Sequence, residues 1–147
     1  MTPHQIFSIA NVVALCCWLL LVIVPGKKWV TTVVAGVAVP AVFAAVYSII
    51  IAINYGGSEG GFGSLSDVAL LFGNPWLLLA GWIHYLAFDL LVGSWEARDS
   101  RERGIAHLVV VPCLILTFLF GPAGWLLYLG VRSLSARTAQ LPLRTAQ

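Results

Sequence analysis

Long apolar runs separated by short polar stretches dominate the pattern of this chain. The first run covers residues 3–24, the second 30–53 and the third about 75–95. A fourth runs from about 104 to 122, and a further apolar piece follows over 123–131. An α-helix needs about 20 apolar residues to cross a bilayer. The pattern therefore predicts an all-α, polytopic membrane helix bundle of about four transmembrane helices.

Capping residues mark the expected starts of several helices. Thr2 and Asn74 each precede a proline, which suits the first position of a helix. Ser64 precedes a short apolar piece, 64–72, which we expect to be a short interfacial helix before the third span. Pro40 lies inside the second span and predicts a kink there.

The last apolar region is interrupted by Gly121 and Pro122. Together its two pieces contain about 28 residues, which is too many for one straight crossing and too few for two. We therefore expect one broken last helix. The chain is expected to form a single transmembrane domain, 1–134, followed by a disordered tail, 135–147, because the residues beyond Arg132 are mostly small or polar.

Composition supports a membrane protein and excludes several function classes. Hydrophobic residues make up 60% of the chain and charged residues 10%, with a mean hydropathy of +0.94. A soluble domain has roughly 25% charged residues. The net charge of +2 is too small to indicate nucleic-acid binding. All three cysteines lie in apolar runs, which is typical of small buried residues and predicts neither a disulfide nor a metal site.

The distribution of lysine and arginine predicts the orientation. The loop after the first span contains Lys27 and Lys28, the loop after the second contains none, and the expected loop 96–103 contains three arginines. The positive-inside rule places both basic loops in the cytoplasm and the N-terminus outside, as in a protein of a bacterial inner membrane. Four crossings leave Arg132 outside, against this rule. A last piece that re-enters would put all eight basic residues inside, although its nine apolar residues, 123–131, do not span a bilayer.

The third span contains ionisable side chains, which are costly in hydrocarbon and usually functional. Residues 81–95 read GWIHYLAFDLLVGSW. Drawn as a helix, this stretch has an aliphatic side, which we expect to face lipid, and a side with aromatic and ionisable residues. The aliphatic side holds Leu79, Ile83, Leu86, Ala87 and Leu90, and the other side holds Gly81, Trp82, His84, Tyr85, Phe88 and Asp89.

Asp89 and His84 lie near mid-depth, and His107 lies nearer the basic loop. A carboxyl group away from water can hold a proton and donate it, and a histidine can accept one. Facing a cavity, they would suit proton transfer on an apolar substrate. Because His84 and Asp89 are about 140° apart on a helix, they are not expected to form a contiguous pair or a metal site. Alternatively, these side chains only join helices, in a polar network that also includes Asn11, Glu96, Arg98 and Asp99.

The stretch between the second and third spans is rich in glycine. It has no Lys-Ser/Thr pair after the glycines and no strand before them, so it does not indicate a phosphate-binding loop. We expect a linker. The alternative is a lid over a cavity, with Glu59 or Asp67 taking part.

Residues 81–95, together with 96–99 (EARD), Pro112-Cys113 and 118–122 (FLFGP), resemble the abscisic-acid-deficient-4-like membrane proteins. The resemblance covers about residues 1–134. Plant members of that family are neoxanthin synthases of the chloroplast. The first span begins almost at Met1, without a transit peptide, so the chain is similar to short bacterial members.

The resemblance implies isomerisation of an epoxy-carotenoid, in which the 5,6-epoxide opens and a proton leaves the adjacent chain carbon to give an allene and a tertiary alcohol. This reaction needs an acid and a base and no redox cofactor. The hypothesis assigns Asp89 as the acid and His84 or His107 as the base. The residues expected to line an apolar slot, where aromatic rings would stabilise a developing cation, are Trp82, Tyr85, Phe88 and Trp125.

Two other function classes remain open. One is a non-catalytic protein that binds a carotenoid or isoprenoid lipid, or assists membrane assembly. The other is a small proton-coupled transporter, which is less favoured because the sequence has no matching pair of interrupted helices. In each case the expected partners are membrane lipid and an isoprenoid ligand, and a homo-oligomer is compatible with each.

Overall fold

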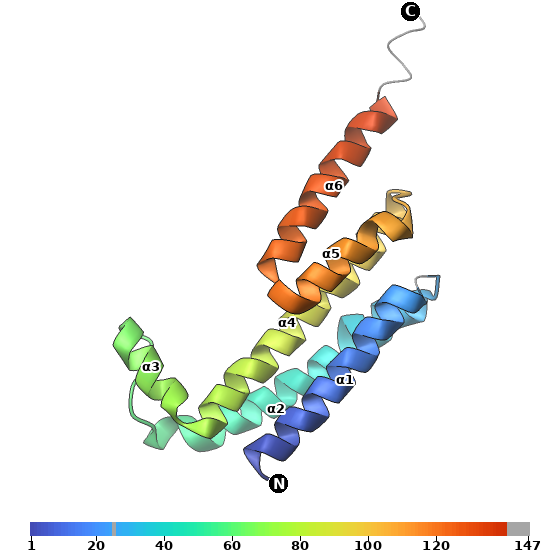
Figure 1. Cartoon of the computed structure of the whole chain (residues 1–147). Helices are drawn as coiled ribbons and strands as arrows, with labels where there is room; N and C mark the ends of the chain where they lie inside the picture. The colour runs from blue at the N-terminus through green and yellow to red at the C-terminus, as the bar shows by residue number, and fades with distance from the viewer. Residues whose placement is uncertain (25, 141–147) are drawn as a thin grey trace, which may run out of the picture.

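The computed structural model describes residues 1–24 and 26–140, with side-chain surroundings up to residue 135. Every element in this described part is a helix (Figure 1). The elements are α1 (Pro3–Ile23), the π-helix η1 (Val30–Ala38), α2 (Val39–Asn54), the short 3₁₀ turn η2 (Tyr55–Gly57), α3 (Leu65–Gly73), α4 (Pro75–Glu102), α5 (His107–Phe120) and α6 (Pro122–Gln140). The predicted all-helical fold is confirmed.

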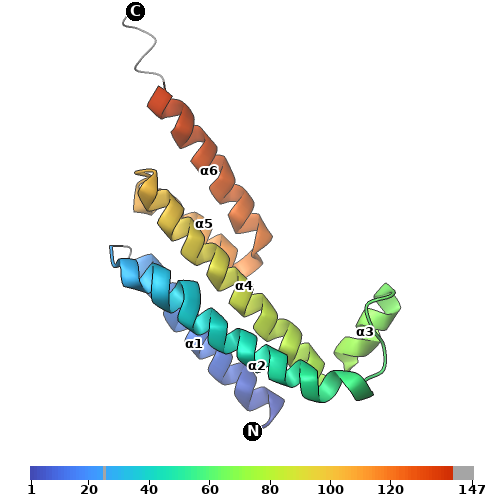
Figure 2. The same cartoon turned by 180° about the vertical axis from the view of Figure 1, so that it is seen from behind.

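Three stretches are long and apolar enough to cross a membrane: Pro3–Ile23, Val30–Gly57 and Pro75–Glu102. They lie side by side, with α4 packed against both α1 and α2 (Figures 1 and 2). The fold therefore suits an integral membrane protein. Helix α5 has 14 residues and is about 21 Å long at 1.5 Å per residue, which is shorter than a hydrocarbon core of about 30 Å.

The expected capping residues do begin their helices. The Thr2 hydroxyl accepts from the Gln5 amide, and the Gln5 side chain accepts from the Thr2 amide at 2.9 Å. Ser64 and Asn74 likewise accept backbone amides at the starts of α3 and α4, at 3.1 and 2.9 Å. These bonds satisfy amides that a helix start leaves unpaired. The short helix expected before the third span is present as α3, which projects from the bundle in Figure 1.

The second span contains a wide helical stretch ahead of Pro40. Residues Val30–Ala38 wind as a π-helix before α2 continues from Val39. Proline lacks an amide donor, so the regular bond to the preceding turn is missing at this point. Gly36 lets the wide stretch approach α4, because a Cβ at this position would lie 2.8 Å from Nη1 of Arg98.

Helix α4 continues further than the sequence indicated. Residues 96–103 were expected to form a loop, but the helix runs to Glu102 and the connection to α5 is residues 103–106. Glu96 and Asp99 are buried. A mixed-charge run is often a solvated connector, yet here Glu96 and Asp99 have partners on α5 and α6, and these partners keep them inside the protein.

The final two helices form a hairpin rather than one broken helix. Helices α5 and α6 pack against each other and run in opposite directions (Figures 1 and 2). Gly121 joins them with a φ of +42°, a conformation that glycine adopts at little cost. Helix α6 continues to Gln140, past residue 134, where the tail was expected to begin. The rest of that expected tail, 141–147, lies outside the described residues.

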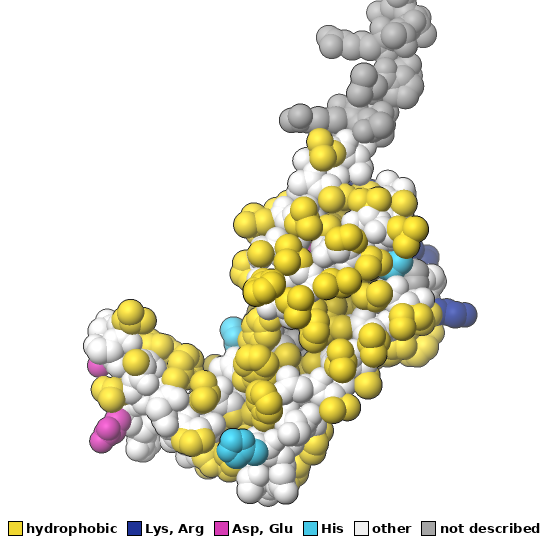
Figure 3. All heavy atoms as spheres, in the orientation of Figure 1, with side chains coloured by type: hydrophobic (Ala, Val, Ile, Leu, Met, Phe, Trp, Pro, Cys, Tyr) yellow, Lys and Arg dark blue, Asp and Glu magenta, His cyan; other side chains and the backbone are white. Residues whose placement is uncertain are grey.

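The hairpin gathers basic residues at one end of the molecule. Lys27 and Lys28 follow α1, Arg103 follows α4, and Arg132 lies on α6 within 3.0 Å of Asp99, near the end of α4. In the view of Figure 3, hydrophobic side chains cover the bundle and Lys and Arg lie toward this end. This is the re-entrant arrangement that the sequence left open. That this end faces the cytoplasm stays a prediction.

Asp99 fastens the hairpin to α4. Its Oδ2 accepts hydrogen bonds from the Tyr128 hydroxyl at 2.6 Å and from Nε of Arg103 at 2.8 Å. The same oxygen lies 3.0 Å from Nε of Arg132. Trp95 packs edge-on against Tyr128, with ring centroids 5.4 Å apart, and its ring centroid lies 5.7 Å from the Arg132 guanidinium. This group of side chains, the Asp99 cluster, joins α4 to α6.

The aliphatic side of α4 faces the protein and not lipid, contrary to expectation. Leu79, Ile83, Leu86, Ala87 and Leu90 are each at most 4% exposed and belong to the core formed with α1 and α2. Lipid and a protein interior are equally apolar, so side chains alone did not distinguish the two. The aliphatic side of α4 is buried because α4 lies between α1 and α2 and the hairpin in the bundle.

We expect Gly93→Ala to destabilise the protein. A Cβ at this position would overlap the Trp18 ring of α1, and overpacking of this kind costs about 1–3 kcal/mol. Gly130→Ala is the matched control, since no heavy atom lies within 4 Å of its Cβ position. Alanine there should add about 0.5–1 kcal/mol of helix stability. Unfolding of both variants in detergent measures this, and equal effects would contradict the close α1–α4 contact.

We also expect Tyr128→Phe to loosen the hairpin. The substitution removes a donor to the buried Asp99 carboxylate, and hydrogen bonds to charged groups contribute about 1.5–3 kcal/mol. Tyr55→Phe is the control, because Tyr55 is exposed and its hydroxyl has no hydrogen bond to any described residue. The same unfolding measurement should show a loss for Tyr128→Phe alone. No loss would mean that the Asp99 cluster does not hold the hairpin.

Candidate functional site

The tip of the α5–α6 hairpin meets α4 at Asp89. A Cβ on Gly121 would lie 2.8 Å from Oδ1 of Asp89, so a larger residue would displace the carboxyl group. Asp89 is half-buried, and its Oδ2 is buried without a hydrogen-bond partner among the described residues. Such an oxygen is uncommon and costs free energy. It marks the tip of the hairpin as a candidate site.

Tyr85 lies one helical turn before Asp89 and connects it to the hairpin. Its hydroxyl donates to the carbonyl of Phe118 at 3.0 Å and is also within reach of the Asp89 carboxyl. Phe118 belongs to the last turn of α5, where carbonyls have no partner within the helix. The bond therefore satisfies a carbonyl at the end of α5 and fixes the position of the hairpin tip along α4.

Beyond the hairpin tip, this side of α4 is open and aromatic. Leu78, Trp82 and Phe88 are 55%, 39% and 56% exposed. The rings of Trp82 and Tyr85 have centroids 5.4 Å apart. Asp89, Tyr85 and Trp82, all singled out from the sequence, thus occupy one region of α4, whereas the Phe88 ring contacts that of His84.

His84 lies on a different side of α4, toward α2 and α3. Its ring centroid is 5.6 Å from that of Tyr47 and 4.6 Å from that of Phe88. It borders a cavity of about 270 Å³ whose other lining residues are Tyr47, Ile51, Phe62, Leu71, Phe72, Leu77 and Gly81. The structure therefore does not bring the imidazole beside Asp89.

His107 lies at the start of α5, at the opposite end of that helix from Phe118. Its Nε2 is 2.8 Å from the carbonyl oxygen of Val22. A carbonyl only accepts hydrogen bonds, so Nε2 carries the proton. This bond satisfies one of the unpaired carbonyls at the end of α1. His107 joins helix ends and is not placed near Asp89.

The remaining expected residues lie at several contacts between helices. The Asn11 side chain of α1 accepts from Nε1 of Trp82 at 3.1 Å. Glu96 is fully buried, and its carboxyl oxygens lie 3.0 and 3.2 Å from the donating hydroxyl of Thr117. Arg98 packs near Gly36. Asp99 belongs to the Asp99 cluster described above, which joins α4 to α6. Trp125 is exposed, one turn past the hairpin tip.

Sequence reasoning missed Thr117 and Tyr128, which hold the two buried acids. The available signal was a hydroxyl group inside each apolar piece of the last region. Such a group needs a partner in hydrocarbon. An acidic run on the preceding helix was the natural candidate.

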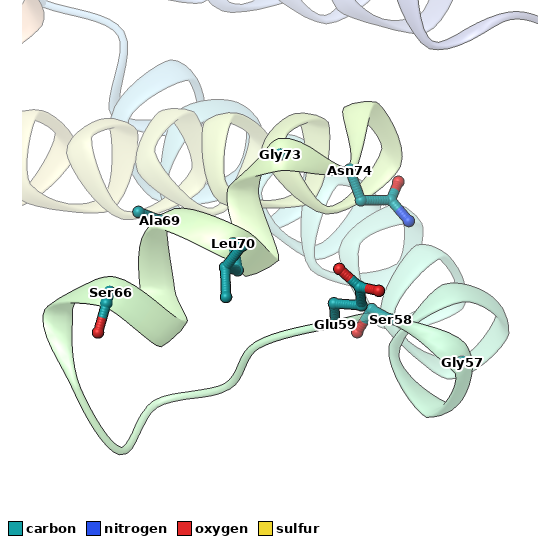
Figure 4. Close-up of a pocket in the computed structure, with 8 residues that line it drawn as sticks. All are labelled: Gly57, Ser58, Glu59, Ser66, Ala69, Leu70, Gly73 and Asn74. Atoms are coloured by element: carbon teal, nitrogen blue, oxygen red, sulfur yellow. The ribbon is translucent and has the colours of Figure 1, made fainter.

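A separate cavity of about 750 Å³ lies between the glycine-rich loop and α3 (Figure 4). Glu59 extends from the loop toward Asn74 at the start of α4 (Figure 4). Asn74 is 15 residues before Asp89, or about 22 Å along the helix. The loop thus covers this outer cavity and not Asp89. Within the described residues, no group of three or more His, Cys, Asp or Glu side chains could hold a metal ion.

The known protein families include one that matches. A family model described as ABA DEFICIENT 4-like (ABA4-like) matches residues 5–128. That range includes Asn11, all of α4 and the hairpin as far as Tyr128. No curated protein and no solved structure matches the chain. The chain belongs to the ABA4-like family, and its apolar helices suit a membrane protein related to neoxanthin synthase.

Proposed function

We propose that this protein isomerises an epoxide on a carotenoid-type isoprenoid by acid–base catalysis, with Asp89 as the group that exchanges protons. One observation carries the proposal: a half-buried carboxyl group has an oxygen without a hydrogen-bond partner among the described residues, amid apolar and aromatic side chains. The relation of the family to neoxanthin synthase supports an epoxy-carotenoid as the substrate class.

The first step uses Asp89 as an acid. Its protonated carboxyl group donates to the epoxide oxygen, and the carbon–oxygen bond nearer the polyene breaks. The electron pair stays on the oxygen, which becomes a tertiary hydroxyl. Positive charge develops on the carbon next to the polyene, and the aromatic faces of Trp82 and Tyr85 stabilise such a charge.

The second step uses Asp89 as a base. The base role first assigned to His84 or His107 is less suited to this geometry, because both lie elsewhere. We propose instead that the carboxylate left by the first step takes the proton from the adjacent chain carbon through its other oxygen. Loss of this proton forms the allene and restores the carboxyl group. One proton is given and one is taken, so the reaction is balanced without an oxidant or reductant.

The apolar surroundings favour this outcome over hydrolysis. Water would attack the cation and give a diol instead of an allene. The hairpin tip covers Asp89 from the basic end of the molecule through Gly121 and Phe118. A site that excludes water prevents such side reactions.

We expect Asp89→Asn to abolish isomerisation in cells that make violaxanthin. Asparagine preserves the shape but cannot exchange protons, and loss of general acid–base catalysis lowers rates by about 10²–10⁴-fold. The control is Glu59→Gln, which changes an exposed loop carboxylate. Chromatography of the pigments should show a neoxanthin-type allene with the wild type and the control only.

Two results would count against the proposal. Equal product from Asp89→Asn and the wild type would remove Asp89 from the mechanism. Violaxanthin that copurifies unchanged with the wild type would favour a binding or assembly role.

A further inference from the structure

We infer that the open face of α4 from Leu78 to Asp89 binds an extended isoprenoid chain, with its oxygen-bearing end at Asp89 and its tail toward the N-terminus of α1. The identity of the reacting end rests on the proposed function. The binding track itself rests on the arrangement of side chains.

The track is a stripe along one helix face. Leu78, Trp82, Tyr85 and Asp89 are spaced by four, three and four residues, which aligns them on one side of α4. Eleven residues at 1.5 Å each make the stripe about 16 Å long. The hairpin closes it at one end, because Gly121 meets α4 at Asp89.

The other end of the stripe opens into a cavity of about 410 Å³, between the N-terminal ends of α1 and α4. This volume lies within the range of about 300–1,000 Å³ that is usual for ligand pockets. Its lining residues are Pro3, His4, Phe7, Pro75, Leu78, Leu79 and Trp82. The Trp82 ring also contacts that of Tyr85, so the side chains of the cavity wall adjoin those beside Asp89.

One wall of the track is held rigidly. Nε1 of Trp82 donates to Oδ1 of Asn11 at 3.1 Å, and Nδ2 of Asn11 donates to the carbonyl of Phe7 at 2.8 Å. The Phe7 and Trp82 rings have centroids 5.5 Å apart. The indole is thus oriented by its contacts with α1.

The polar atoms of the track select its occupant. Trp82 and Tyr85 already use their donors on Asn11 and on the Phe118 carbonyl. Of the described groups between the cavity and the hairpin tip, the Asp89 carboxyl is the one with a buried oxygen lacking a partner. The hydrocarbon of a fatty-acyl chain has no hydrogen-bonding group for this carboxyl. An isoprenoid with an oxygen function at its inner end satisfies this group and fills the apolar track.

Photo-crosslinking tests this inference directly. Phe7 and Tyr55 are both aromatic and both 41% exposed, but Phe7 lines the cavity and Tyr55 lies at the end of α2. Each is replaced, in separate full-length proteins, by p-benzoylphenylalanine, and the protein is placed in phosphatidylcholine nanodiscs with violaxanthin. Mass spectrometry then measures the violaxanthin adduct. We expect at least about tenfold more adduct at position 7, the ratio given by 1.4 kcal/mol of preferential binding.

A second comparison addresses the oxygen-bearing end. β-Carotene, which has no oxygen, should give several-fold less adduct at position 7 than violaxanthin, and Asp89→Asn should reduce this preference. Equal adducts at positions 7 and 55 would overturn the track. Equal adducts from the two pigments would overturn the role of Asp89 in recognition. A strong adduct at position 7 without any allene product supports the track and counts against the proposed catalysis alone.

Discussion

The contacts of Asp99 with Tyr128, Arg103 and Arg132 determine where the candidate site can form. Tyr128 lies seven residues, or two turns, after Gly121, so its bond to Asp99 sets how far the hairpin reaches along α4. The tip then stops at Asp89, about 15 Å from Asp99 along the helix. A buried carboxylate with several donors is stable, whereas loss of one partner is costly. The Asp99 cluster near the end of α4 therefore places the hairpin tip beside Asp89, in the middle of that helix.

The same rule, that polar groups in an apolar medium need partners, accounts for the contacts at helix ends. Tyr85 donates to a carbonyl in the last turn of α5, and His107 donates to one in the last turn of α1. A helix end inside a bilayer is tolerated only where the protein satisfies it. These side chains make a short hairpin possible where two full crossings do not fit. Tyr85 and His107, both candidate site residues in the sequence, thus have structural roles at helix ends.

The sequence predicted the first three spans and their capped helix starts because hydrophobic length and capping chemistry are local properties. It predicted Asp89 together with Tyr85 and Trp82 because their spacing on one helix places them together. It misassigned residues 96–102 because the partners of Glu96 and Asp99 lie 21 and 29 residues away, on α5 and α6. The lipid-facing side of α4 could not be predicted either, since lipid and a neighbouring helix accept the same aliphatic side chains.

The hairpin also gives the molecule an uneven cross-section. At the basic end five helical rods lie together, namely α1, α2 with η1, α4, α5 and α6. Beyond the hairpin tip the described bundle consists of α1, α2 and α4, with the short α3 packed against α4. Embedded in a bilayer, such a wedge displaces more area in one leaflet than in the other. Lipids of the second leaflet must spread to fill the volume below the tip.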